Sequence, residues 1–147
     1  MNNYKKVSII IPAYNESRTI RDIVNRARAA DVLGLEKEII IVDNYSQDGT
    51  REILREFAAL PHVKIIFHSK NEGVGVSWRD GMAIASGDIL LRQDADTEYQ
   101  PEDIKLLLAP IVEGRSQVVY GSRILGSEKS QYSYQTNLWG GDFVNAI

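Results

Sequence analysis

The sequence contains no cysteine among its 147 residues. This absence excludes disulfide bonds and thiolate metal sites, and it is compatible with a reducing cytoplasm. Basic clusters are also missing: seventeen lysines and arginines stand against twenty acidic residues, for a net charge of −3. Nucleic acid is therefore not an expected partner. Only a short apolar run, Val7–Ile11, follows the polar first residues, so we expect neither a signal peptide nor a membrane span there.

Known phosphate-binding loops are missing as well. The chain has no GxxxxGK[ST] run, and the GxGxxG pattern that begins at Gly73 and Gly75 fails because Trp78 stands where the third glycine belongs. We expect these two glycines to allow a tight turn and a close approach of the backbone to a ligand. His62 and His68 lack the spacing of a metal site and are expected to be solvated or packed.

The composition is that of one globular domain with one core: 44% of the residues are hydrophobic and 25% are charged. Short apolar runs predict five strands: Val7–Ile11, Glu38–Val42, Val63–Phe67, Asp88–Leu91 and Val118–Tyr120. Helical periodicity follows each of the first four. We expect Pro12 to end the first strand and Asn15 or Ser17 to cap the first helix.

This alternation of strands and helices predicts an α/β fold with βαβ units. The sheet should be mainly parallel, with spatial order three-two-one-four and helices on both faces. Regular patterning ends near Arg123. We therefore assign residues 1–123 to the core and expect a subdomain boundary at that point.

Polar residues gather after the predicted strands, where ligands bind in sheets of this kind. Asp94 and Asp96 are the most informative pair, because two carboxylates at i and i+2 repel each other unless a cation or solvent neutralises them. Mg²⁺ takes one or two such carboxylates together with substrate phosphates. Taken alone, the pair is better explained as an exposed, solvated turn, and it is the polar residues after the other strands that favour the metal. Asp43 and Asn44 could bind a base edge, although Ser46 or Asp48 in the same loop could simply cap a helix.

Four segments taken together resemble family 2 glycosyltransferases: VSIIIPAYNE, IIIVDNYSQDGT, NEGVGVSWRDGMAIASGDILLRQDAD and VVYGSR. The likeness covers roughly residues 7 to 123 and looks closest to the branch that makes dolichyl- or polyprenyl-phosphate sugars. It implies a GT-A fold that binds a nucleoside-diphosphate sugar. It further implies sugar transfer with inversion, a Mg²⁺ or Mn²⁺ cofactor, and a cytoplasmic protein that works at a membrane face on a polyprenyl-phosphate acceptor.

The resemblance also implies site residues. Asp94 and Asp96 would bind the metal, with Asp96 as the principal ligand. Arg123 would lie near the phosphates, and Asp43 would hold the base or ribose. The complete expected donor-binding set is Pro12, Ala13, Tyr14, Glu16, Asp43, Asn44, Lys70, Gly73, Asp94, Ala95 and Arg123.

The chain departs from the family pattern in three places. Asn44 stands where the family often has a second acid, and Ser77-Trp78 replaces a small residue often followed by a basic one. Residues 124–147 look like the start of an acceptor-side region that is cut short, in which Asp142 is a poor candidate for a catalytic base. We therefore expect the chain to bind donor but to transfer sugar poorly by itself. A donor-binding module without transferase activity is the alternative; a nucleotidyltransferase ranks last, because Pro12–Glu16 is not a glycine-rich, basic loop.

Overall fold

The structure, a computed structural model, describes residues 3–121. In that range four parallel strands form one sheet in the order β3-β2-β1-β4, which confirms the order predicted from the sequence. The strands are β1 (Lys6–Ala13), β2 (Glu36–Asp43), β3 (Val63–Phe67) and β4 (Ile89–Arg92). β1 and β2 pair along their whole length, so their carboxyl ends finish side by side at Ala13 and Asp43.

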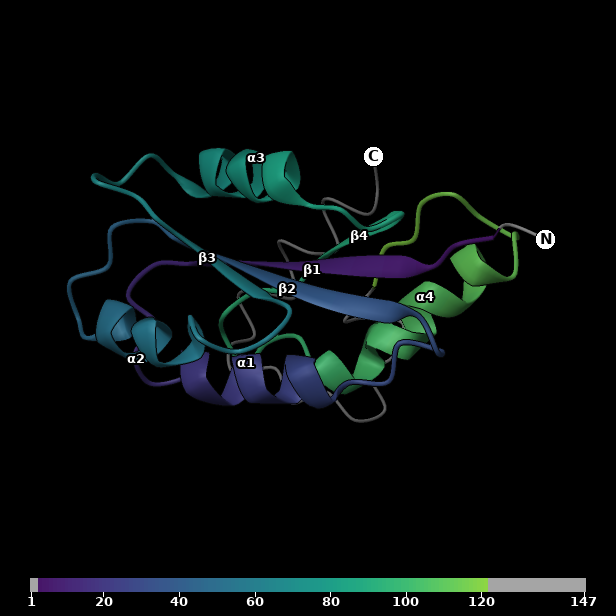
Figure 1. Cartoon of the computed structure of the whole chain (residues 1–147), viewed down its shortest axis with the longest axis horizontal. Helices are drawn as coiled ribbons and strands as arrows, with labels where there is room; N and C mark the ends of the chain where they lie inside the picture. Colours follow the sequence, from purple (N-terminus) through teal and green to yellow (C-terminus); the bar gives the residue numbers. More distant parts are fainter. Residues whose placement is uncertain (1–2, 122–147) are drawn as a thin grey trace, which may run out of the picture.

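Helices cover both faces of this sheet, also as predicted (Figure 1). They are α1 (Ile20–Ala29), α2 (Thr50–Phe57), α3 (Val74–Ile84) and α4 (Ile104–Val112), the last preceded by a short 3₁₀ turn at Pro101–Asp103. α3 lies alone on one face, and α1, α2 and α4 lie on the other. No helix among residues 3–121 is long and apolar enough to cross a membrane.

The two central strands are buried on both faces. On β1, Ile9 and Ile11 pack into the larger core with α1, whereas Ile10 points to the opposite face and packs with Ile40 and the residues of α3. All three isoleucines of β1 are fully buried. A continuous β-branched run is what a strand with two covered faces requires, and this is why the first two strands could be recognised from sequence.

The prediction that Pro12 ends the first strand is wrong, because β1 continues to Ala13 and Pro12 pairs in register with Val42. The Ala13 carbonyl accepts from Asn44 N, so the backbone N–H and C=O of Ala13 point toward β2. Because these groups alternate along a strand, the backbone of Pro12 points toward β4, whose pairing with β1 ends at Ile10↔Arg92. The missing proline N–H therefore falls just beyond the last paired residue, where it costs no ladder hydrogen bond.

The expected cap of α1 is also wrong. Thr19 stands at the N-cap, without a side-chain capping bond. Asn15 and Ser17 instead tie the β1 loop to the β2 loop: Asn15 Oδ1 accepts from Gln47 N at 2.9 Å, and Ser17 N donates to Asp48 Oδ2 at 2.9 Å. Asparagine and serine can bond to any nearby backbone group. Here the contacts with the β2 loop take the place of the expected capping bond at the start of α1.

The fifth predicted strand does not form in the described part of the chain. Val118–Tyr120 belongs to no helix or strand, and Val118 and Tyr120 are 64% and 90% exposed. The Ser116 hydroxyl donates to the Val118 carbonyl at 2.6 Å, and Val118 N returns a bond to the same hydroxyl. An apolar β-branched run needs a neighbouring strand to become one, and a local turn satisfies this backbone instead.

Candidate functional site: a cleft at the carboxyl edge of the sheet

A cleft of about 240 Å³ lies at the carboxyl ends of β1, β2 and β4, beside the first turns of α3. This is the edge at which open parallel sheets bind ligands. The residues that line the cleft are Pro12, Ala13, Tyr14, Glu16, Asn44, Val74, Ser77, Arg92, Asp94, Ala95 and Asp96. Eight of the residues expected from the sequence to bind the donor or the metal, Asn44 among them, are therefore gathered in one place.

The turn that carries Asp94 and Asp96 is anchored by Gln93, which is 3% exposed. Its backbone N–H donates to the Ile10 carbonyl, and its amide donates to the carbonyls of Asp94 and Tyr99 at 3.1 Å each. The two carboxylates are thus held on a short rigid turn directly after β4. A buried amide that donates to two carbonyls of one turn helps to fix the shape of that turn.

The same two carboxylates form a donor set suited to a hard divalent cation. Asp94 and Asp96 both line the cleft, and all their donor atoms are oxygens, as Mg²⁺ and Mn²⁺ prefer. One Asp94 oxygen is already neutralised, since Oδ1 lies 2.8 Å from both Arg92 Nε and Arg92 Nη2. Asp96 Oδ1 accepts from Glu98 N at 3.0 Å. The residues present therefore fit such an ion, with Arg92 as its competitor for Asp94.

The first loop supplies the flat and the acidic parts of the cleft wall. Tyr14 is 49% exposed, so its ring is available to a ligand. Glu16 is held from both sides: its N–H donates to Thr50 Oγ1 at 2.8 Å, and its carboxylate accepts from the Thr19 hydroxyl at 2.9 Å. The loop is therefore positioned by the start of α2 rather than left free.

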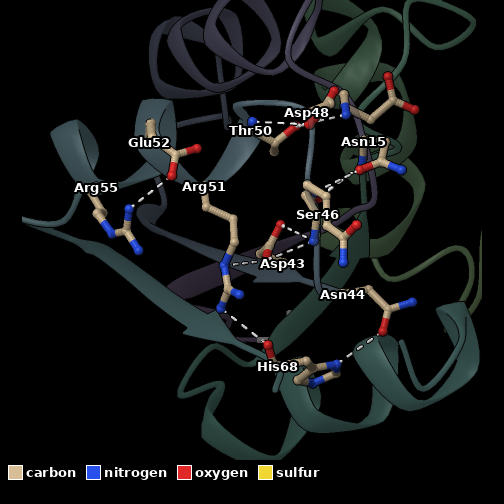
Figure 2. Close-up of polar contacts among 12 residues, drawn as sticks. Asn15, Asp43, Asn44, Ser46, Asp48, Thr50, Arg51, Glu52, Arg55 and His68 are labelled. Atoms are coloured by element: carbon tan, nitrogen blue, oxygen red, sulfur yellow. Dashed lines mark hydrogen bonds and ion pairs between the residues drawn. The ribbon is translucent and has the colours of Figure 1, made fainter. Parts of the chain in front are cut away.

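Asp43 is placed differently from what its expected role suggests. It is fully buried and is not among the residues that line the cleft. Its carboxylate lies 3.1 Å from Arg51 Nε and 3.3 Å from the Ser46 N–H (Figure 2). The Arg51 guanidinium also lies 5.1 Å from the centre of the Phe67 ring and donates to the His68 carbonyl. In this structure Asp43 shapes the β2 loop from beneath the cleft.

Asn44 is the residue of this pair that reaches the cleft wall. It is 5% exposed and firmly held: its Nδ2 donates to Asn71 Oδ1 at 2.9 Å, and its Oδ1 accepts from Glu72 N at 2.8 Å. His68 Nδ1 lies 3.2 Å from the same Oδ1 (Figure 2). The amide therefore links the end of β2 to the loop before α3.

The remaining expected residues do not line the cleft. The Lys70 side chain is 75% exposed and lies 3.4 Å from Glu72 Oε1. Gly73 precedes α3 with φ of 87°, a left-handed value that favours glycine, while its neighbours Val74 and Ser77 reach the cleft. Arg123, Asp142 and the proposed region 124–147 lie outside the described residues.

One residue of the cleft wall, Arg92, is absent from the set expected from the sequence. It is the last residue of β4, where buried and exposed positions alternate. That alternation, followed directly by an acidic pair, is the signal that could have identified a cation aimed at the same edge.

A second hollow, of about 230 Å³, opens near the amino ends of β2 and β3 and is lined by Arg28, Lys37 and His62 among others. The half-buried ammonium of Lys37 is already engaged, because its Nζ donates to the carbonyls of Ala27, Arg28 and Ala30 at the end of α1. Burial lowers the pKa of Lys37. With its ammonium committed to carbonyls, this hollow offers little to a ligand, so the carboxyl-edge cleft is the better site.

The sequence profile of glycosyl transferase family 2 matches residues 8–143. This chain belongs to glycosyl transferase family 2. Among curated relatives, the dolichol-phosphate mannosyltransferase of Pyrococcus furiosus is 37% identical over 84% of this chain and 35% of its own length. An undecaprenyl-phosphate 4-deoxy-4-formamido-L-arabinose transferase of Aeromonas hydrophila is 34% identical over 78% of this chain and 36% of its own. The chain thus spans about a third of the length of the curated relatives it matches.

Several solved structures share the fold of this chain. Residues 1–349 of Staphylococcus aureus TarS align with a TM-score of 0.63 and 28% identity, over 75% of this chain and 33% of that one. The mannosyltransferase PcManGT from Pyrobaculum calidifontis, solved in complex with GDP-Man and Mn²⁺, aligns with a TM-score of 0.60 and 25% identity, over 69% of this chain and 30% of that one. TarS 1–349 has also been solved in complex with UDP-GlcNAc. The GT-A architecture expected from the motifs is therefore confirmed.

Proposed function

We propose that this chain binds a nucleoside-diphosphate sugar in the carboxyl-edge cleft and provides the donor half of a sugar transferase that acts on polyprenyl phosphate. The observation that carries the proposal is the convergence of Tyr14, Asn44, Asp94 and Asp96 on one cleft. The named activities of the two curated relatives support the acceptor class, and such an acceptor would place the protein at a membrane face.

Metal binding is assigned to Asp94 and Asp96. A divalent cation held there would act as a Lewis acid that offsets the charge of the departing diphosphate. The support from this chain is the all-oxygen donor pair on an anchored turn, and PcManGT was solved with Mn²⁺ bound. Asp96 is proposed as the principal ligand, because one carboxylate oxygen of Asp94 already accepts a hydrogen bond from Arg92.

Arg92 is proposed to exchange partners when the donor binds. Its guanidinium is 48% exposed and can turn from Asp94 toward a phosphate oxygen within the same cleft. Arginine forms bidentate hydrogen bonds to phosphate as readily as to carboxylate. The exchange would release Asp94 for the metal at the moment when the diphosphate arrives.

The nucleoside is assigned to the side of the cleft formed by the first two loops. Tyr14 offers a ring face to a base, and Asn44 offers an amide. Pro12, Ala13 and Glu16 complete this wall. Asp43, expected to hold the base or ribose, is proposed to act from below by fixing the loop that carries Asn44.

Transfer would proceed by one in-line displacement with inversion: an acceptor phosphate oxygen bonds to the anomeric carbon while the bond to the nucleoside diphosphate breaks. A phosphate monoester carries about −1.5 to −2 charge at pH 7. It therefore attacks as an anion and needs no carboxylate to remove a proton, which removes the need for a base in the acceptor-side region.

A thermal-shift panel tests donor binding. UDP-, GDP- and dTDP-sugars are each added with Mn²⁺ or with EDTA, since a ligand at about 100 times its Kd stabilises the folded state by about 2.7 kcal/mol. We expect one nucleotide class to raise the Tm only with Mn²⁺, and Asp96→Ala to abolish the rise. A rise that persists in EDTA, or in Asp96→Ala, would exclude the assigned metal site.

The second candidate is a donor-binding module without transferase activity of its own, favoured by the cleft, where eight residues expected to bind the donor or the metal gather. A transfer assay on the 147-residue chain with polyprenyl phosphate separates the two. Donor binding without turnover favours the module, and turnover without any added protein excludes it.

A further inference from the structure

His68 is buried directly after β3, with oxygen atoms facing both of its ring nitrogens. It is 6% exposed. Its Nδ1 lies 3.2 Å from Asn44 Oδ1, and its Nε2 lies 3.1 Å from Asp80 Oδ2 on α3. A neutral imidazole has only one N–H. One of these two contacts therefore brings a nitrogen lone pair against an oxygen, unless a second proton on the ring or a metal ion lies between them.

Backbone groups decide which nitrogen carries the proton. Gly73 N donates to Asn71 Oδ1 at 3.0 Å, which identifies that atom as an acceptor, and Asn44 Nδ2 donates to the same atom. Glu72 N donates to Asn44 Oδ1 at 2.8 Å. Because a backbone N–H can only donate, these bonds fix the orientation of the Asn44 amide. Asn44 therefore presents an acceptor to His68 Nδ1, which must carry the hydrogen.

In the neutral form of the ring, the lone pair of His68 Nε2 then points at the Asp80 carboxylate. Glu72 completes the group, since one ligand atom from each of His68, Glu72 and Asp80 lies within 4.8 Å of the others. Ligands about 2.0–2.2 Å from a tetrahedral metal are about 3.3–3.6 Å apart. Small rotations of the two acidic side chains reach that geometry, because Asp80 and Glu72 are 36% and 34% exposed.

We propose that His68, Glu72 and Asp80 form a second divalent-cation site, separate from Asp94 and Asp96, that takes an imidazole-accepting transition metal such as Zn²⁺. One imidazole nitrogen and two carboxylates leave a coordination position for water, and imidazole favours Zn²⁺ over Mg²⁺. The bond from Nδ1 to Asn44 is the outer contact that metal-bound histidines characteristically make.

Two lysine or arginine side chains compete for these carboxylates. Lys70 Nζ lies 3.4 Å from Glu72 Oε1, and Arg79 Nε lies 3.8 Å from Asp80 Oδ1. Both side chains are more than 70% exposed, so solvent screens their attraction. A divalent ion, with twice the charge and a shorter contact, displaces them.

The site has a positioning role, because it holds the residue that reaches the donor cleft. The metal fixes His68, and His68 holds Asn44 Oδ1 in place. Through Glu72 and Asp80 the site also joins the loop before α3 to α3 itself, the helix that contributes Val74 and Ser77 to the cleft wall. Donor affinity is therefore expected to respond to Zn²⁺ even when the Asp94–Asp96 site is supplied with Mg²⁺.

Metal titration tests the site. Isothermal titration with Zn²⁺, and visible absorption with Co²⁺, are measured for wild type, His68→Gln and Asp80→Asn. We expect each variant to weaken Zn²⁺ binding by more than about tenfold, since loss of an outer contact alone costs about 10- to 100-fold. His62→Asn is the matched control, because His62 is the only other histidine in the chain. Asp96→Ala should leave this Zn²⁺ binding intact. A failure of the proposed second site can therefore be told apart from a failure of the proposed function.

Nuclear magnetic resonance of the two histidine rings supplies a readout on wild type that does not depend on variants folding. With Zn²⁺ added, the ¹⁵N shifts of His68 should show a protonated Nδ1 and a metal-bound Nε2. Two protonated nitrogens in the presence of excess Zn²⁺ would overturn the proposal and identify a simple imidazolium–Asp80 ion pair. Zn²⁺ binding that His68→Gln and Asp80→Asn leave unchanged would overturn it equally.

Discussion

Glu38 is a charged residue on the central strand β2, yet it is 1% exposed. Its carboxylate accepts hydrogen bonds from the Ser8 hydroxyl and Ser86 N at 2.6 Å each, and it lies 2.9 Å from Lys64 Nζ. Burial alone raises the pKa of Glu38, but the bonds from Ser8, Ser86 and Lys64 outweigh it and hold that pKa well below its usual range. The carboxylate joins β1, β2, β3 and the turn before β4.

Glu38→Gln is expected to lower the free energy of unfolding at pH 7 by about 2–3 kcal/mol, because charged hydrogen bonds are lost in a buried site. A folded-state pKa below the unfolded value of about 4.3 gives stability that is present above pH 4.3 and lost as the pH falls. The difference between wild type and variant in urea denaturation should therefore shrink below about pH 4. Glu36→Gln, an exposed position on the same strand, is the control and should change little.

Arg92 tests the exchange of partners proposed for the cleft. Arg92→Ala removes the cation that lies 2.8 Å from Asp94 Oδ1. We expect Mn²⁺ alone to bind more tightly, and the nucleotide sugar to bind about tenfold more weakly, since charged hydrogen bonds to phosphate contribute about 1.5–3 kcal/mol. Calorimetric titration measures both. Arg28→Ala, at the opposite edge of the sheet, should alter neither, and parallel changes in the two affinities would contradict the exchange.

At the scale of residues, the sequence predicted which edge of the sheet carries the candidate site, but not how each residue is placed there. The acidic pair Asp94 and Asp96 could be placed at this edge because it directly follows a predicted strand, and both residues line the cleft. Asp43 and Asn44 could not be separated, since only the fold shows that one is buried under Arg51 while the other reaches the cleft. The approach of Asp80 to His68 depends on where α3 lies against the sheet, so a histidine expected to be merely packed or solvated is a candidate ligand.

Helix α3 approaches the sheet closely through Gly81. A Cβ added there would lie 2.6 Å from Ile10 Cγ2, an atom bonded directly to a Cβ that is itself packed in the core. Gly81→Ala is therefore expected to lower the free energy of unfolding by about 1–3 kcal/mol. Gly75→Ala lies in the same helix with nothing within 4 Å of the added carbon. It should be neutral or stabilise by up to about 1 kcal/mol, and equal losses in urea denaturation would show that close packing is not the cause.

Elements that carry their own burial pattern were predictable from the sequence. β1 and β2 appear as continuous β-branched runs, and α1 buries Ile20, Ile23, Val24 and Ala27, which recur at helical spacing. Val118–Tyr120 shows the limit of this reasoning. An apolar run specifies a strand only when another strand lies beside it, and no local pattern in the sequence reveals whether one does.

At the scale of the whole molecule, the sheet order follows from chain geometry. Right-handed crossovers and helices on both faces leave few orders open to four parallel strands. Because the strands are parallel their carboxyl ends share one edge, and the observed order makes the loops after β2, β1 and β4 neighbours there. The cleft is thus a consequence of topology, assembled from segments that are unremarkable singly. The central proposal is that this edge of the sheet binds a complex of a metal ion and a nucleotide sugar.

Paramagnetic broadening of backbone amide signals tests that claim most directly. Mn²⁺ and the nucleotide sugar selected by the thermal-shift panel are added to the Asp80→Asn variant, which lacks a ligand of the second site. Amides of Ala13, Ser77 and Ala95 at the cleft should broaden first, while those of Glu36 and Lys64 near the opposite edge stay sharp; a further Asp96→Ala change should remove the effect. Broadening centred on the amino ends of the strands, or broadening unchanged by Asp96→Ala, would contradict it.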